Sequence, residues 1–258
     1  MRNIRVCLLL TLAALAGAAA VGAQQPAKAS LILKTRMSLG GKQVKFSRKR
    51  FYLFRGGSDV NKALAERIKA AAYTSRDCFY CSQKASPEYM AWLQVADCES
   101  PYCREITADD TAKVPEFKAA YAKALTLYKN KPDLARTWLT TSMPPELRDG
   151  YYLQRKKATD GILSGVKPLA TVMTDATSQQ ATFIDIFLTP GKESEKFFVS
   201  NVLPFESGGK AYTWICEVDV KPSSNILTLP PATASKSGSK CEVIAKDLPK
   251  CDSGGCKQ

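Results

Sequence analysis

Cysteine placement is the feature that most limits what this chain can fold into. The 258 residues include nine cysteines and no histidine. One cysteine, Cys7, lies in an apolar run from Val6 to Val21, which follows the basic start MRNIR and precedes the small residues VGA. This order predicts a secretory signal peptide over residues 1–23, removed after Ala23. We therefore expect an exported protein, periplasmic or extracellular, whose eight remaining cysteines form structural disulfides.

An uncleaved membrane anchor is the alternative interpretation of the same N-terminal run. The run is short for a bilayer span, which needs about 20 apolar residues, and it is rich in alanine. No other apolar stretch approaches that length. The sequence therefore predicts a protein that has no transmembrane segment once the signal peptide is removed.

The spacing of the eight cysteines suggests which of them are neighbours. They occur as Cys78/Cys81, Cys98/Cys103, Cys216, Cys241 and Cys251/Cys256. From proximity alone, we expect the first four to pair among themselves, Cys216 to pair with Cys241, and the last two to close the loop CDSGGC. Sequence spacing does not fix connectivity, so this pairing is a hypothesis.

The C-x-x-C spacing in RDCFYCSQ also admits other chemistry. A redox dithiol usually occurs in a βαβ context, which the surrounding pattern lacks. Haem attachment needs histidine directly after the second cysteine, where Ser82 stands. A zinc site would need four free thiolates, which an oxidising compartment disfavours. We expect no cofactor and no metal, and keep thiol-disulfide exchange through Cys78 and Cys81 as an alternative function.

Hydrophobic periodicity predicts an α+β fold. Residues 28–57 and 151–230 alternate with the period of strands, whereas residues 58–150 carry helical stripes and caps, such as Ser86 before Pro87. We predict an antiparallel β-sandwich built from residues 28–57 plus 151–230, with residues 58–150 as a disulfide-stapled helical insertion. Residues 231–258 are predicted to be a cysteine-containing linker and tail. A strand arm leading into two separate domains is the alternative.

One segment resembles a known family. The stretch from Lys167 to Asn201 contains the series V-x-T-D, A-x-F-x-x-I and a strand ending in a Y-x-V-S-like run. It resembles the prealbumin-like sandwich of carboxypeptidase regulatory-like domains over about 35 residues. The matching positions are Val172, Thr174, Asp175, Ala181, Phe183, Ile186, Phe198 and Val199. The resemblance implies a non-catalytic accessory or adhesive module and supplies no catalytic residues.

Positive charge is concentrated in the first strands. The net charge is +13, and the two arginines of the signal peptide leave +11 on the mature chain. Residues 24–58 hold nine basic residues and no acidic one. This pattern predicts contact with an unknown protein or an anionic envelope polymer, and export argues against nucleic acid. The candidate residues are Lys45, Arg48, Lys49, Arg50 and Arg55.

The same stretch has a purely structural interpretation. The aromatic residues Phe46, Phe51, Tyr52 and Phe54 interleave with the cations. Aromatic side chains on a half-buried strand can face inward while the cations face water and protect an edge from aggregation. A stacking platform for a ligand would show the same pattern.

The sequence offers no clear catalytic centre. Absence of histidine excludes Ser-His-Asp and Cys-His catalysis and histidine-ligated zinc. Asp109-Asp110 and Glu193/Glu195 are acidic pairs in predicted loops, and carboxylate pairs can converge in space without a sequence signature. We therefore expect a non-catalytic binding or structural module of the cell envelope or extracellular space. A carboxylate-based glycan hydrolase is a third possibility.

Overall fold

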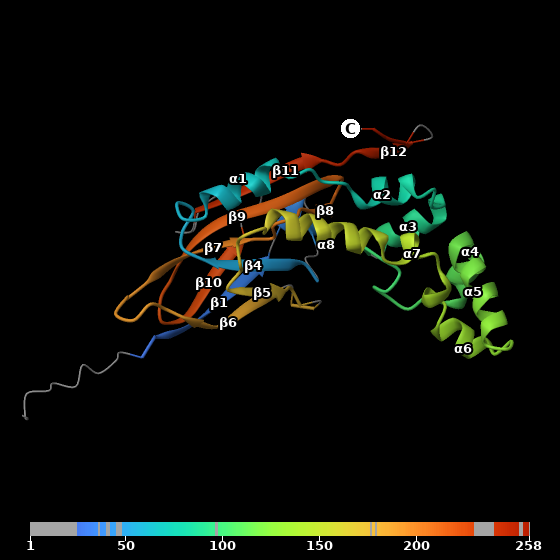
Figure 1. Ribbon diagram of the computed structural model, residues 1–258, viewed down its shortest axis with the longest axis horizontal. Coiled ribbons are helices and arrows are strands. Elements are labelled where there is room, and N and C mark those ends of the chain that lie inside the picture. The colour runs from blue at the N-terminus through green and yellow to red at the C-terminus, as the bar shows by residue number, and fades with distance from the viewer. Residues whose placement is uncertain are drawn as a thin grey trace, which may run out of the picture.

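The fold is α+β, with two sheets packed face to face and a group of helices extending from one end (Figure 1). The computed structural model describes residues 25–258 except 36, 40–41, 45–47, 96–97, 176, 179, 230–239, 253–254 and 258. The expected signal peptide and the predicted contact residues Lys45 and Phe46 therefore lie outside the described residues. We call the two packed sheets the two-sheet body.

The smaller sheet has three strands in the order β10-β1-β6. Strand β1 runs antiparallel to β6 and parallel to β10, with Ile32 opposite Thr182 on one side and Ile226 on the other. The strands are β1 (Lys28–Thr35), β6 (Gln180–Phe187) and β10 (Ser223–Leu229).

The larger sheet is antiparallel throughout and has the order β11-β9-β7-β4-β5, with β8 paired to β9. Strands from both sides of the helical segment share this sheet, because β4 precedes the helices and its neighbours follow them. The strands are β4 (Arg50–Arg55), β5 (Ala170–Met173), β7 (Glu195–Ser200), β8 (Phe205–Ser207), β9 (Lys210–Val220) and β11 (Lys240–Asp247). Two small hairpins add β2 (Met37–Leu39) with β3 (Lys42–Val44), and β12 (Lys250–Asp252) with β13 (Gly255–Lys257).

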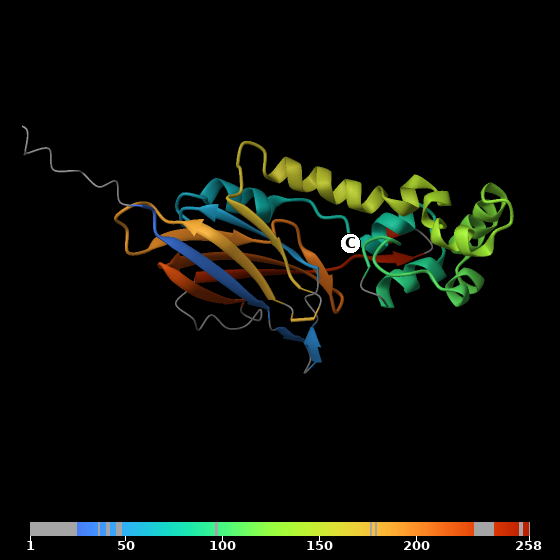
Figure 2. The same cartoon turned by 90° about the horizontal axis from the view of Figure 1, so that it is seen from below.

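Strand β4 is buried on both faces, which explains its run of aromatic residues. Phe51 and Leu53 face the core between the sheets, together with Trp214 of β9. Tyr52 and Phe54 face the opposite way, where two helices cover the large sheet (Figure 2). These helices are α1 (Lys62–Ala70) and α8 (Gly150–Ile162). Phe51, Tyr52 and Phe54 are all buried, which confirms the expectation that these aromatic side chains point into the protein. The strand is buried on both faces, whereas the sequence predicted burial of one face only.

The remaining helices form what we call the helical lobe, from α2 to α7. Its core is aromatic, with Tyr80, Tyr89, Trp92 and Phe117 in edge-to-face contacts. Ser86 caps α3 by accepting from the Tyr89 backbone N–H, as the sequence predicts. The lobe comprises α2 (Arg76–Ser82), α3 (Pro87–Val95), α4 (Ala108–Lys113), α5 (Pro115–Leu127), α6 (Pro132–Thr137), the 3-10 helix η1 (Thr140–Ser142) and α7 (Pro145–Arg148).

The structure corrects two segment predictions. The run YYLQRKK, expected as a strand, is the start of α8, where Tyr151, Ala158 and Ile162 turn inward at helical spacing. Part of the expected linker and tail is β11, which pairs with β9 along eight residues and forms an edge of the large sheet. Tyrosine-rich local propensity favoured a strand in the first case, and tertiary packing overrode it.

Two carboxylates of the large sheet are nearly buried and hold neighbouring loops. Glu217 accepts from the Ser58 backbone N–H at 2.7 Å and from Lys196 Nζ at 2.9 Å. These hydrogen bonds, that from Lys196 foremost, lower the pKa of Glu217. Burial opposes ionisation of Glu195, but hydrogen bonds from Arg55 and Thr189 outweigh it and lower its pKa. Both groups therefore favour the folded state when ionised.

We predict a loss of stability on acidification that depends on Glu217. A carboxylate with a lowered folded-state pKa stabilises fully above its unfolded pKa of about 4.3, and this contribution disappears as the pH falls through the folded-state value. Urea unfolding at pH 7 and pH 3 should show Glu217→Gln less stable than wild type by about 1–3 kcal/mol at pH 7, with the difference shrinking at pH 3. Glu193→Gln, at an exposed position, is the matched control. An equal difference at both pH values would contradict the prediction.

Candidate functional site

A cavity of about 590 Å³ lies where β4, β5, α8 and the helical lobe meet. Its floor is the helix-facing side of the large sheet, formed by Arg50 and Tyr52 of β4 and Met173 of β5. Alternation places residues 50 and 52 on the same face of the strand. Helix α8 crosses this part of the sheet, and together they leave a hollow beside the lobe.

One face of α8 forms a wall of the cavity. Tyr152, Arg155, Lys156 and Thr159 all line it. Their spacing of three, four and seven residues puts them on one side of a helix. This spacing is a signal that could have been found in the sequence, but the segment was interpreted as a strand, so Arg155 and Lys156 were missed.

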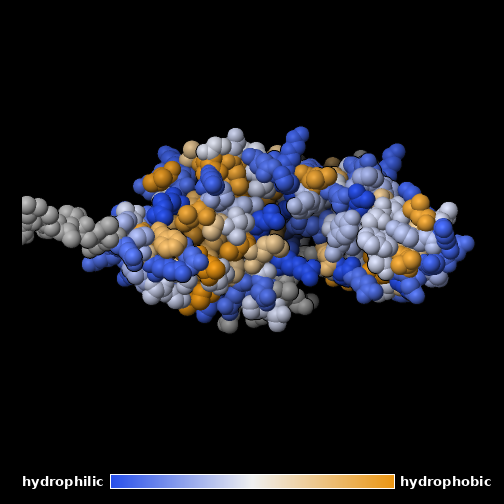
Figure 3. Space-filling model, turned by 60° about the horizontal axis from the view of Figure 1, so that its bottom comes forward, coloured by the Kyte–Doolittle hydropathy of each residue, from blue (hydrophilic) through white to orange (hydrophobic). Residues whose placement is uncertain are grey.

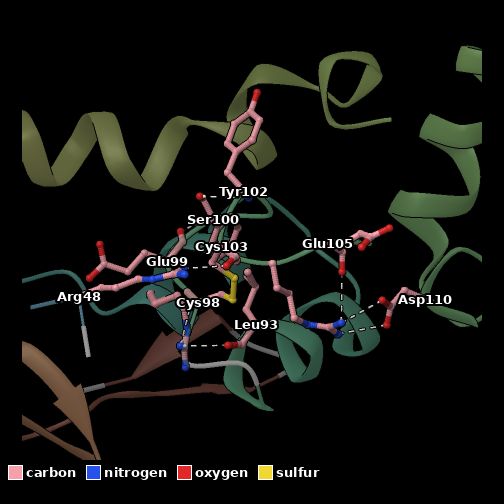
Figure 4. The surroundings of a disulfide bond; sticks show 12 residues. Arg48, Leu93, Cys98, Glu99, Ser100, Tyr102, Cys103, Glu105 and Asp110 are labelled. Carbon is pink, nitrogen blue, oxygen red and sulfur yellow. Dashed lines mark hydrogen bonds and ion pairs between the residues drawn. A yellow bond between two sulfur atoms is a disulfide. The ribbon is translucent and has the colours of Figure 1, made fainter. Parts of the chain in front are cut away.

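A disulfide-closed loop of the lobe forms another wall. Cys98 and Cys103 are bonded, with their Cα atoms 5.6 Å apart, and the loop between them brings Glu99 and Ser100 to the cavity. Figure 4 shows Arg48 reaching toward this loop, where its Nη1 donates to the Cys103 carbonyl oxygen at 2.8 Å. The contact joins the two-sheet body to the lobe at the rim of the cavity.

Positive charge dominates the lining. Both acidic residues among the lining residues are already engaged: Glu99 pairs with Arg155 at 3.5 Å, and Asp160 with Lys156 at 2.9 Å. The basic lining residues outnumber them and are Arg48, Lys49, Arg50, Arg155 and Lys156. A cleft with low-dielectric walls and one sign of charge concentrates anions.

The candidate residues from the basic strands separate into two groups. Arg48, Lys49 and Arg50 line the cavity, and the Lys49 ammonium lies 5.6 Å from the centre of the Phe205 ring. Arg50 is exposed and makes no side-chain hydrogen bond or ion pair with any described residue. Arg55 lies at the other end of β4, where its Nη1 donates to Glu195 at 2.6 Å and its Nη2 to the Phe187 carbonyl. Arg55 therefore has a structural role.

Arg155 is held by a polar network between the lobe and the two-sheet body. Its Nη1 donates to the Pro204 carbonyl at 3.0 Å, and the guanidinium lies over the rings of Tyr73 and Tyr151. Both tyrosines contact Glu206 of β8, at 2.6 Å from Tyr73 and 3.3 Å from Tyr151. Burial raises the pKa of both phenols, so they stay protonated and donate. Although burial disfavours its charge, Glu99 and the tyrosines raise the pKa of Arg155, which remains a cation.

The disulfides correct part of the expected pairing. Cys216–Cys241 joins β9 to β11 as predicted, and Cys98–Cys103 is a pair within the first group. The other two bridges are Cys78–Cys256 and Cys81–Cys251, with Cα atoms 5.3 and 6.0 Å apart. The expected closure of the tail loop by Cys251 and Cys256 is therefore wrong, and so is the expected pairing of Cys78 and Cys81 within the first group of four. The chain after β11 returns to the lobe, which sequence proximity could not reveal.

The C-x-x-C pair lies on helix α2. Ser75 accepts from the Cys78 backbone N–H and caps α2, which carries both Cys78 and Cys81 on the side facing the β12–β13 hairpin. Each is bonded to the hairpin, and they are not bonded to one another. A C-x-x-C oxidoreductase cycles through a bridge between its own two cysteines, so this arrangement gives that chemistry no support.

The expected acidic pairs lie away from the cavity lining. Asp110 forms a capping box with Thr107 and pairs with Arg104, and Asp109 pairs with Lys113. Glu195 is engaged by Arg55. Within the described ranges, no group of three or more cysteine, aspartate or glutamate side chains is arranged to hold a metal ion.

Comparisons with known proteins identify no relative. No family model, no curated protein and no solved structure matches this chain. In the part of the chain that the structure describes, no helix has the length and apolar character needed to cross a membrane.

We predict that the two tail bridges act non-additively on stability. They join the same two elements, so either bridge alone closes the long loop, which spans 170 residues between Cys81 and Cys251. Chain-entropy reasoning gives about 2–3 kcal/mol for removing one bridge and more than twice that for removing both.

The measurement is guanidinium unfolding of Cys81→Ser/Cys251→Ser, of Cys78→Ser/Cys256→Ser and of the fourfold variant. Peptide mapping without reduction should first confirm the two bridges in the wild type. The Cys98→Ser/Cys103→Ser variant, which opens only a short loop, is the control. Equal and additive losses from the two tail bridges would contradict the prediction.

Proposed function

We propose that this protein is an exported, non-catalytic binding module that holds an anionic partner of the cell envelope or extracellular space in the basic cavity. The observation that carries the proposal is Arg50. A guanidinium group with no partner among the described residues lies in a hollow with further cations on the opposite wall, Arg155 and Lys156. Arginine presents a planar set of donors suited to carboxylate and phosphate groups.

Features outside the cavity support export and a binding role. The N-terminal sequence has the order of a signal peptide, and four disulfides fit an oxidising compartment. The prealbumin-like resemblance is consistent with an accessory or adhesive module. Its matching positions Val172 and Phe183 lie on β5 and β6, which belong to different sheets. Export also favours an envelope polymer or a protein over nucleic acid.

A catalytic function has less support from the geometry. The two carboxylates of the cavity, Glu99 and Asp160, are paired with cations of the same cavity. A glycan hydrolase needs one carboxyl group that is kept protonated and a second that is free to act as base or nucleophile. Thiol-disulfide exchange would need Cys78 and Cys81 to be released from the tail. Insulin reduction that disappears in Cys81→Ser would favour that alternative.

We predict that Arg50→Glu weakens retention on an anionic matrix. Reversing this charge places a carboxylate among the cavity cations and removes a guanidinium that has no partner among the described residues. On a dextran sulfate column, the variant should elute at clearly lower salt, and its affinity for soluble dextran sulfate at low salt should fall by about tenfold.

Lys118→Glu on α5 is the matched control, because it changes the net charge equally at an exposed position remote from the cavity. Its retention should stay much closer to wild type. Equal loss in both variants would indicate a response to total charge, and unchanged retention of Arg50→Glu would reject the cavity as the contact site.

A further inference from the structure

The floor of the cavity places an apolar side chain next to a basic one. Arg50 of β4 and Met173 of β5 are directly opposite in the antiparallel register. Opposite residues project on the same face, with their Cβ atoms about 5 Å apart. Met173 is 50% exposed although it lines the cavity. The cation and the thioether therefore border the same space.

The facing wall repeats this combination. Tyr152 of α8 lines the cavity with 48% of its surface exposed. Arg155 and Lys156 follow it by three and four residues, which puts both cations one helical turn along the same face. The floor and the α8 wall thus each offer one exposed apolar side chain and at least one cation. The two surfaces come from elements far apart in the sequence.

The volume argues against a site for a bare inorganic ion. About 590 Å³ lies within the range of pockets that hold an organic molecule, whereas a phosphate ion would fill a small part of it. The lining also includes the buried side chains of Leu203 and Phe205. A ligand that fills the space must therefore satisfy both apolar and cationic walls.

We propose that the cavity binds an organic anion in which an oxyanion group is joined to an apolar body. The oxyanion lies between Arg50 and the α8 cations Arg155 and Lys156. The apolar body lies between Met173 and Tyr152. This inference rests on the proposed function, and it adds that the partner is recognised through a discrete amphipathic unit rather than through charge alone.

Binding of model compounds by isothermal titration calorimetry tests the inference. The probes are 1-naphthyl phosphate and 1-naphthoate, which distinguish a phosphate group from a carboxylate group. The control compounds are inorganic phosphate, which lacks the apolar body, and 1-naphthol, which lacks the oxyanion group. We expect one or both naphthyl anions to bind at least tenfold more tightly than inorganic phosphate or 1-naphthol. Near-ultraviolet circular dichroism of each variant checks that it is folded.

Four variants locate the site. Arg50→Gln should weaken the naphthyl anion about tenfold, and Met173→Asn and Tyr152→Asn about fivefold each without altering net charge. Ile226→Asn is the control for non-specific apolar binding. Exposed apolar side chains also gather over the two-sheet body (Figure 3), and Ile226 on the outer face of the smaller sheet is 57% exposed. Its substitution should leave the affinity unchanged.

Several outcomes would overturn the inference. Inorganic phosphate binding as tightly as the naphthyl anions, or no effect of Met173→Asn and Tyr152→Asn, would reduce the site to a simple anion site. If Arg50→Glu still lowers dextran sulfate retention, the proposed function would survive that result. Weaker naphthyl binding in Ile226→Asn, with the cavity variants unaffected, would place the ligand on the smaller sheet. Loss of both the naphthyl binding and the Arg50-dependent retention would reject both proposals.

Discussion

One carboxylate, Glu206, ties the helical lobe to the two-sheet body. It projects from the short strand β8 and accepts from the Arg76 backbone N–H and the Tyr73 hydroxyl, each at 2.6 Å, and from Tyr151 at 3.3 Å. These donors belong to the start of α2, the segment before it and the start of α8. A single acceptor therefore sets where the lobe begins and where α8 leaves it. The cavity lies beside this junction, and α8 contributes one of its walls.

The same junction positions one of the cations that line the cavity. Tyr73 and Tyr151, held by Glu206, lie against Arg155 and keep that cation at the wall, while Glu99 from the disulfide-closed loop neutralises part of it. The first residues of β4 bring their own cations from the opposite side. Because the two sets converge from separate elements, their fields add in a partly enclosed space where water screens them less than at an open surface. A sequence rich in lysine and arginine becomes a localised site only through this convergence.

Local patterns predicted the parts of the fold that depend on local physics. The strand-like character of residues 28–57 identified β4, a serine-proline start identified α3, and closeness in sequence identified the Cys216–Cys241 bridge, but burial of β4 on both faces was not predicted. The α+β class followed from the change of period near residue 58. The missed parts depend on contacts between distant segments. Helix α8 begins with two tyrosines that favour strands locally, and its helical state is stabilised where Tyr151 enters the lobe core and Ile162 reaches the sheet. The α8 wall of the cavity was missed with it, since Arg155 and Lys156 face the basic strand only when the segment is helical.

The bonds from Cys78 to Cys256 and from Cys81 to Cys251 also determine when these disulfides can form during synthesis of the chain. The helix α2 cysteines are synthesised about 170 residues before their partners, as the sequence separations of 178 and 170 show. During that interval their only possible partners are the other cysteines upstream of position 251, including each other. Covalent closure of α2 onto the hairpin must wait until Cys251 and Cys256 have been synthesised. A chain truncated before β12 would therefore lack both native partners, and the thiols of Cys78 and Cys81 would be left to react with each other.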